Sequence, residues 1–231
     1  MFPSAVGSKL LMAATGLAIL LFVLGHLAGN LQFFGGPDVI NTYALHLRDL
    51  GPLLWVARLG LLAAFALHLS LAVSLTRRNS LARPEGYAFQ TDFPQSSVAS
   101  RHMWLTGWLI LAFVVFHLAH FTFQWTHPEY RELHWKASDG REGHDVYSMI
   151  IKGFSQPFLV GLYIVAQVFL WLHLSHAVSS MLQTLGLKNP RNEKLLDLAG
   201  PVLATIIFVG YVSIPLAVLL GVVKPIVISS G

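Results

Sequence analysis

Five long runs of apolar residues divide the chain, and polar segments separate them. The runs cover approximately residues 10–34, 53–76, 103–125, 157–183 and 199–223. Each is long enough for a helix to cross a hydrocarbon core of roughly 30 Å, which takes about twenty apolar residues. The segments 77–102, 126–156 and 186–198 are rich in charge, proline and glycine and are predicted to be solvated loops. The pattern predicts an all-α integral membrane protein, a single membrane domain over residues 1–231 with five transmembrane helices.

Composition agrees with this class and excludes several others. The chain is 55% hydrophobic and 11% charged, whereas soluble domains carry roughly 25% charged residues. Its 15 Lys+Arg and 11 Asp+Glu are scattered, so we expect basic loops beside anionic membrane lipid and no nucleic-acid partner. The absence of cysteine excludes disulfides, thiolate-held iron–sulfur clusters and covalently attached c-type haem. Any metal must therefore be held by nitrogen or oxygen.

The distribution of Lys and Arg predicts the orientation. With five spans the termini lie on opposite sides, and cytoplasmic loops carry the excess of positive charge. A cytoplasmic N-terminus places eight of the fifteen basic residues inside, including the adjacent Arg77 and Arg78. We therefore expect a multi-pass protein of the cell inner (cytoplasmic) membrane with its N-terminus in the cytoplasm. The eight are Lys9, Arg77, Arg78, Arg83, Arg101, Lys188, Arg191 and Lys194.

The apolar runs contain an internal repeat. Residues 12–28 and 103–119 share ten of seventeen positions, including a Thr-Gly pair and a histidine. Residues 67–74 (LHLSLAVS) and 172–179 (LHLSHAVS) agree at seven of eight positions. Parallel repeats of this kind occur in membrane proteins. The sequence therefore predicts a helical hairpin, about 10–76, that is repeated at about 103–183 and followed by a fifth helix.

Four histidines recur in register in this repeat. His26 and His117 each lie fourteen residues after a methionine in helices of the same direction, which puts both about 20 Å from the inner ends. His68 and His173 share the opposite direction, and His68 lies about 10 Å from the inner end. Ionisable groups inside a membrane are costly unless paired or ligating. Two histidine pairs at two depths predict bis-histidine ligation of two b-type haems within a four-helix bundle.

Other interpretations of the histidines stay open. A single histidine in a span is often only an interhelical hydrogen bond, and the set could also line a proton or metal path in a non-redox transporter. A structural anchor without haem is a further alternative. His120 and His176 fall outside the repeated set, and we interpret them as propionate or quinone hydrogen-bond partners or as interhelical contacts.

Several stretches resemble a known family. They are SKLLMAATGLAILLFVLGHLAGNLQFF at 8–34, FVVFHLAHF at 113–121 and GLYIVAQVFLWLHLSHAVSSMLQTLG at 161–186. Together they resemble the cytochrome b subunits of succinate dehydrogenase and fumarate reductase, specifically the single-chain, five-helix, two-haem cytochrome b558 type. The resemblance covers nearly the whole chain. It departs at Ala177, where the family pattern has glycine after the second histidine of the pair.

The resemblance implies a role for each repeated histidine. His26 and His117 match the axial ligands of the distal haem, and His68 and His173 match those of the proximal haem. It also implies a flavoprotein subunit, which would carry the succinate site, and an iron–sulfur subunit on the cytoplasmic face. Electrons would pass between that subunit and a quinone, menaquinone by expectation. The rival is another quinone-linked cytochrome b, of the nitrate reductase or hydrogenase type.

The resemblance also points to two surfaces. The loops 77–102 and 186–198 would dock the iron–sulfur subunit through Arg77, Arg78, Lys188, Arg191 and Lys194. Some family members have an acidic residue near the distal haem that serves quinol proton transfer. No residue is assigned that role here; Asp38 and Asp49 lie in the corresponding loop, and the polar candidates on that half are Asn30, Gln32, His46, His120 and Gln124.

Overall fold

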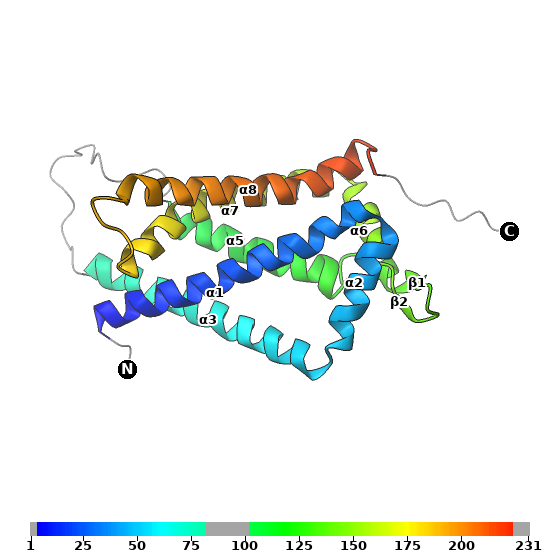
Figure 1. Cartoon of the computed structure of the whole chain (residues 1–231), viewed down its shortest axis with the longest axis horizontal. Coiled ribbons are helices and arrows are strands. Elements are labelled where there is room, and N and C mark those ends of the chain that lie inside the picture. The colour runs from blue at the N-terminus through cyan, green and yellow to red at the C-terminus, as the bar shows by residue number, and fades with distance from the viewer. Residues whose placement is uncertain (1–3, 82–101, 224–231) are drawn as a thin grey trace.

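Five long helices run side by side along the length of the molecule (Figure 1). A computed structural model of the protein describes residues 4–81 and 102–223. The long helices are α1 (Ala5–Leu31), α3 (Pro52–Leu81), α5 (Met103–His117), α7 (Pro157–Thr184) and α8 (Glu193–Leu219). Each, with the short turns that extend α1 and α5, is long and apolar enough to cross a membrane. The prediction of five apolar helices in a multi-pass membrane protein is therefore confirmed at this level.

The helix ends differ from the predicted span ends. Helix α3 continues to Leu81, so Arg77 and Arg78 belong to its last turns and not to a loop. Helix α8 begins at Glu193 and already contains Lys194. Apolar runs mark the part of a helix that lipid covers, whereas backbone hydrogen bonding continues into polar residues that are good helix formers. Most of the predicted loop 77–102, with Arg83 and Arg101, lies outside the described residues.

The lateral surface of the bundle is apolar. Large hydrophobic side chains point outward from the middle of α3, α5 and α8, among them Leu59, Leu62, Val115 and Ile206. Continuous exposed apolar surface of this kind is unfavourable in water and is expected where a protein faces lipid. Helix α8 also carries Pro201 and Pro215 in its interior, which membrane helices tolerate because neighbouring groups satisfy the freed backbone.

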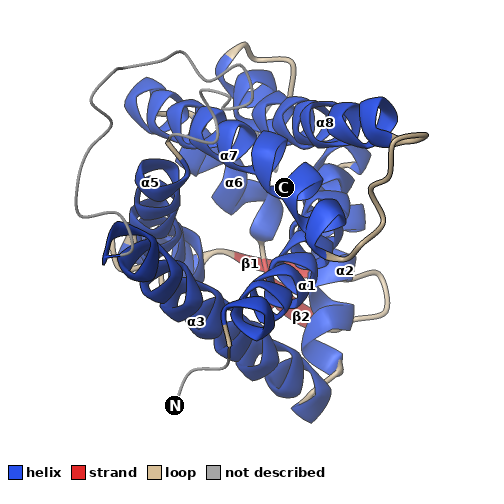
Figure 2. Ribbon diagram, turned by 90° about the vertical axis from the view of Figure 1, so that its left-hand side faces the viewer, coloured by secondary structure: helices blue, strands red, loops and turns tan. Residues whose placement is uncertain are grey.

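The helices pack as two hairpins and an added helix. Helix α1 lies along α3, α5 lies along α7, and the most extensive contact of the bundle joins α7 to α8 (Figure 2). Tyr211 of α8 donates its hydroxyl hydrogen to the carbonyl oxygen of Val23 on α1 at 2.8 Å. Helix α8 thus bridges the two hairpins. The start of α1, the end of α3 and the turn between α7 and α8 lie at one end of the molecule (Figure 1).

The opposite end is closed by a cap, defined here as α2 (Pro37–Asp49) together with residues 128–154. The second part contains a 3-10 turn (Pro128–Glu132), an antiparallel pair of strands, β1 (His134–Lys136) and β2 (Glu142–His144), and helix α6 (Val146–Phe154). A 3-10 turn, Gln32–Gly35, leads from α1 into α2. The prediction of a solvated loop over 126–156 is therefore wrong, and the segment that contains Asp38 and Asp49 is helical.

The cap folds because its apolar residues share one face. In α6, Tyr147, Ile150, Ile151 and Phe154 are buried against Phe33 and Ile40 and against the ends of α7 and α8. Charged residues in the preceding turn masked this short apolar helix in the sequence. Buried Asn41 joins the two parts: its Nδ2 donates to Asp145 Oδ1 at 3.0 Å, and the amide of Tyr147 donates to its Oδ1 at 3.1 Å. Asp145 also caps α6 by accepting from the amide of Ser148.

Candidate functional site

The four repeated histidines lie on four different helices and at two levels of the bundle. His26 on α1 and His117 at the end of α5 lie toward the cap, and His68 on α3 and His173 on α7 lie toward the other end. All four side chains are half-buried. His68 contacts Thr15, which precedes His26 by eleven residues, so the two levels are separated by about 16 Å along α1.

The structure brings His26 and His117 together. Their ring centroids are 6.0 Å apart and the ring planes are nearly perpendicular, at 79°. Two imidazoles that bind one metal ion from opposite sides, with nitrogen–metal bonds of about 2.0–2.1 Å, have centroids roughly 6.3 Å apart. The centroid spacing of His26 and His117 is therefore close to that of two imidazoles on one ion. Phe22 stacks on His26 at a centroid distance of 5.3 Å, and Phe113 and Phe121 flank His117.

Each histidine of the second pair is held by a threonine of its own hairpin. His68 Nδ1 lies 3.1 Å from Thr15 Oγ1, and His173 Nδ1 lies 3.2 Å from Thr106 Oγ1. These threonines occupy equivalent positions in the sequence repeat. The two hairpins therefore present their imidazoles in the same way, one from each side of the bundle.

The threonine contacts determine which ring nitrogen is free. Thr15 Oγ1 donates to the carbonyl oxygens of Leu11 at 2.8 Å and Met12 at 3.1 Å, and Thr106 Oγ1 donates likewise to His102 and Met103. We assign each hydroxyl hydrogen to a carbonyl of its own helix, so that the hydroxyl oxygen accepts a hydrogen from histidine Nδ1. Nε2 then carries a free lone pair. In this neutral tautomer a hydrogen bond at Nδ1 orients the ring and Nε2 is free to bind a metal, as is common for metal-binding histidines.

A glycine lies beside each of these rings. A Cβ on Gly16 would come within 3.4 Å of His68 Cε1, and one on Gly107 within 3.8 Å of His173 Cε1. Both distances are ordinary van der Waals contacts, so each ring lies directly against the helix that carries its Thr-Gly pair.

Sequence reasoning missed the partners of the other pair. Tyr163 of α7 places its hydroxyl 3.3 Å from His117 Nδ1 and 2.9 Å from His120 Nδ1. His120 is fully buried, and its Nε2 lies 3.4 Å from the hydroxyl of Tyr130 in the cap. The expectation that His120 makes an interhelical contact is met. The available signal was a tyrosine within an otherwise apolar run.

A change of helix type places His120. Helix α5 ends at His117 and continues as one π-helical turn, Leu118–Thr122. The amide of Phe123 donates to the carbonyl oxygen of Leu118 at 2.7 Å, which closes that turn. Such turns occur frequently at functional sites, because the extra residue redirects a side chain. Here the turn directs the His120 ring onto Phe121, at 4.0 Å between centroids, and toward the cap.

Among the residues that the structure describes, one buried side-chain acceptor of the bundle lacks a donor. Gln167 of α7 is buried between the levels of Tyr163 and His173, and its Oε1 has no hydrogen-bond partner. Such an atom costs about 1–3 kcal/mol, and native proteins rarely contain one. A hydrogen-bond donor placed between the two histidine levels would satisfy this oxygen.

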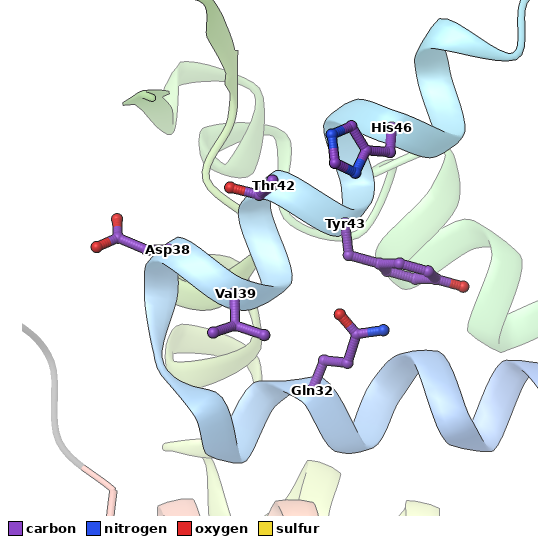
Figure 3. A pocket seen from close by; sticks show the side chains of 6 residues that line it. All are labelled: Gln32, Asp38, Val39, Thr42, Tyr43 and His46. Carbon is purple, nitrogen blue, oxygen red and sulfur yellow. The ribbon is translucent and has the colours of Figure 1, made fainter. Parts of the chain in front are cut away.

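A hollow of about 350 Å³ lies where α1 meets the cap. Figure 3 shows Gln32, at the end of α1, reaching toward the Tyr43 ring of α2, with Asp38 directed away from both. The Tyr43 ring rests on Gly29, where a Cβ would lie 2.7 Å from the hydroxyl oxygen. Gly29 follows His26 by three residues, so the hollow adjoins the His26/His117 level. Its lining residues are Gln32, Asp38, Val39, Thr42, Tyr43 and His46.

The remaining polar candidates have partners elsewhere. Asn30 Nδ2 donates to the carbonyl oxygen of His26 at 2.7 Å. Asp49 forms an ion pair with Arg141 at 2.6 Å. Gln124 Nε2 lies 3.0 Å from His144 Nε2. Of the candidates, the structure thus gathers Gln32, Asp38 and His46 at the hollow.

Charges and pKa values at the two ends also bear on the site. In the cap, burial raises the pKa of Tyr130 to about 12, so its hydroxyl keeps its hydrogen. Burial lowers the pKa of His144. At the other end Lys188 Nζ lies 2.8 Å from Asp197 and 3.7 Å from Glu193, so this lysine is engaged within its own chain.

Among the described residues, no three His, Cys, Asp or Glu side chains gather as a metal site. Bis-histidine ligation needs only two protein ligands for each ion, so this result does not bear on the pairs described above. No family model matches the chain, and neither a curated protein nor a solved structure does.

Proposed function

We propose that this chain is a di-haem cytochrome b that anchors a succinate:quinone oxidoreductase in the membrane. It would pass electrons between the iron–sulfur subunit of the complex and a membrane quinone. The observation that carries the proposal is the close approach of His26 and His117, at a centroid distance of 6.0 Å, together with the equivalent threonine contacts of His68 and His173 in the two halves of the repeat.

The residues present suit two b-type haems. Each haem would supply one-electron transfer through its iron, and its potential would depend on ligands, hydrogen bonds and burial. His26 and His117 would hold one haem, and His68 and His173 the other. The chain contributes imidazoles, hydroxyl partners at Nδ1 of His68, His117 and His173, and an apolar interior that excludes water.

The charge distribution favours ligation over ion transport. The ranges 5–31, 52–81, 103–117 and 157–184, which make up the four histidine-bearing helices, contain no Asp or Glu. Proton and cation paths through membranes are commonly built from acidic side chains paired with histidines or basic residues. Four imidazoles without a carboxylate remain neutral most readily, and neutral imidazole is the form that binds iron.

The quinone part of the proposal is supported by the hollow beside α2. It adjoins the His26/His117 level, has an amide in Gln32 and an imidazole in His46, and is bounded by the Tyr43 ring. Quinone headgroups are flat, apolar rings with two oxygens that accept hydrogen bonds, and such a mixed lining suits them. The assignment to the succinate family rests on the sequence resemblance, which also implies flavoprotein and iron–sulfur partners.

A haem count on variants of the purified membrane complex tests the proposal. We expect two b-type haems per chain from the pyridine haemochrome and the reduced-minus-oxidised spectrum. His26→Ala and His117→Ala should lose the same haem, and His68→Ala and His173→Ala the other. His176→Ala is the matched control on α7 and should retain both. An absence of haem, or a haem content that these substitutions leave unchanged, would overturn the proposal.

The partners are tested in the same preparation. A tagged chain should be purified together with a flavoprotein and an iron–sulfur protein, and succinate should reduce its haems. Purification with a nitrate reductase or hydrogenase subunit instead would leave a di-haem cytochrome b but contradict the succinate assignment.

A further inference from the structure

A run of four hydrogen-bonding groups, three of them buried, extends from His117 into the cap. It begins at His117 Nδ1, passes through the hydroxyl of Tyr163 and the two nitrogens of His120, and ends at the hydroxyl of Tyr130, with separations of 3.3, 2.9 and 3.4 Å. His120 and Tyr130 are at most 1% exposed, and Tyr163 is 7% exposed. Metal ligation by itself requires only the first of these contacts.

The donors and acceptors of this run can be assigned in one direction. If His117 binds iron through Nε2, its Nδ1 carries the hydrogen and donates to the Tyr163 oxygen. The single hydroxyl hydrogen of Tyr163 is then free to be donated to His120 Nδ1. His120 consequently carries its own hydrogen on Nε2 and donates it to Tyr130. His117, Tyr163 and His120 each donate one hydrogen along the run, and the Tyr130 hydroxyl oxygen accepts the last of them.

The other histidine pair has a different arrangement behind it. The hydroxyls of Thr15 and Thr106 accept from His68 and His173 but pass their own hydrogens to carbonyl oxygens of the same helix. Those bonds end in the backbone after one step. At the His26/His117 level the bonds continue through two side chains, and successive hydrogen bonds polarise one another in a low-dielectric interior. The two halves of the repeat therefore differ in their electronic surroundings.

We propose that Tyr163 is a positioning residue which, through His120 and Tyr130, fixes the tautomer of His117 and lowers the reduction potential of the haem held by His26 and His117. This inference rests on the di-haem function proposed above. A stronger acceptor at Nδ1 gives the imidazole more anionic character, and a more basic ligand stabilises the oxidised iron. The threonine-backed pair lacks this reinforcement.

Removing the Tyr163 hydroxyl tests the assignment. In Tyr163→Phe we expect both haems to be retained. The reduction potential of the His26/His117 haem should rise by about 59 mV, which for one electron is a tenfold shift of the equilibrium toward the reduced iron. The other haem should keep its potential. Tyr211→Phe is the matched control, because this half-buried tyrosine lies 6.1 Å from the His26 ring but gives its hydroxyl hydrogen to a backbone oxygen.

A second substitution separates tuning from packing. His120→Leu leaves Tyr163 as the acceptor for His117 but removes the next partner, so it should raise the same potential by a smaller factor. The double variant should match Tyr163→Phe, because the run is already broken at its first step. Potentiometric titration followed by absorbance, with the low-spin electron paramagnetic resonance signal of each oxidised haem, provides both readouts.

The outcomes distinguish this inference from the function on which it rests. A wild-type complex without haem would contradict the proposed di-haem function and this inference with it. Two haems whose potentials and resonance signals are the same in wild type, Tyr163→Phe and His120→Leu would overturn only the role of Tyr163. If Tyr163→Phe loses a haem, the His120→Leu variant provides the test. An unchanged potential of the His26/His117 haem in His120→Leu would also overturn the inference.

Discussion

Replacing Gly200 by alanine would force apart the two most closely packed helices of the bundle. A Cβ at Gly200 of α8 would lie 2.3 Å from the backbone oxygen of Ser175 on α7 and 3.1 Å from its carbonyl carbon. Close carbon–oxygen contacts between helices are about 3.3–3.6 Å, so the backbones would have to separate by roughly 1 Å. A backbone carbonyl cannot rotate away as a flexible side chain can. Overpacking of this kind costs about 1–3 kcal/mol.

The displacement would also reach the haem-binding level proposed above. Ser175 follows His173 by two residues, and His173 Nδ1 is held by Thr106 at 3.2 Å. We therefore expect Gly200→Ala to lower the unfolding temperature in detergent by about 4–8 °C, from about 2 kcal/mol and the usual scaling for a chain of this size. It should also weaken retention of the haem at this level, although Gly200 touches none of its ligands.

A matched substitution on α7 controls for the added methyl group. Nothing lies within 4 Å of a Cβ built on Gly161, so Gly161→Ala should be neutral or stabilising by about 0.5–1 kcal/mol, the helical preference for alanine over glycine. Thermal unfolding followed by circular dichroism, together with a haem count, measures both variants. An unfolding temperature of Gly200→Ala equal to that of wild type would refute the reasoning from the close approach of α7 and α8.

Three further predictions concern single side chains. Thr15→Val and Thr106→Val should shift the potential of the same haem, because each removes the Nδ1 acceptor of one ligand; a shift of different haems in the two variants would contradict the pairing. Asn41→Ala should destabilise the cap by about 1–3 kcal/mol, because the amide of Tyr147 loses its acceptor, and proteolysis within 128–154 should accelerate relative to Thr42→Ala. Burial lowers the pKa of His144 in the folded chain. As the pH falls below about 6.5, the unfolded chain therefore takes up a proton at His144 before the folded chain does, and the free energy of unfolding decreases. His144→Gln should reduce that slope in a pH series of unfolding temperatures, and an unchanged slope would show that His144 does not contribute to it.

The sequence was sufficient for the long helices because lipid imposes a fixed length of apolar residues on each. That requirement is local, so runs such as 53–76 identified α3 without reference to any neighbour. The depth of His26 and His117 followed equally from the constant rise of a helix. The segment 126–156 was misread, because the short apolar helix α6 follows a charged turn and its buried face can be recognised only against α2 and the ends of α7 and α8.

The environment of each histidine depended on contacts between distant residues. Tyr163 meets His117 across 46 positions, and Asn41 meets Asp145 across 104. No periodicity in the sequence encodes such pairs. The π-helical turn after His117 directs His120 toward Tyr163, and the glycine at position 200 gives α8 its close approach to α7. The sequence by itself predicted which residues form the apolar spans and how far along each span a residue lies, because those follow from length and rise. Only the tertiary structure decided which side chains face one another, because helix rotation and packing are settled by all the helices together.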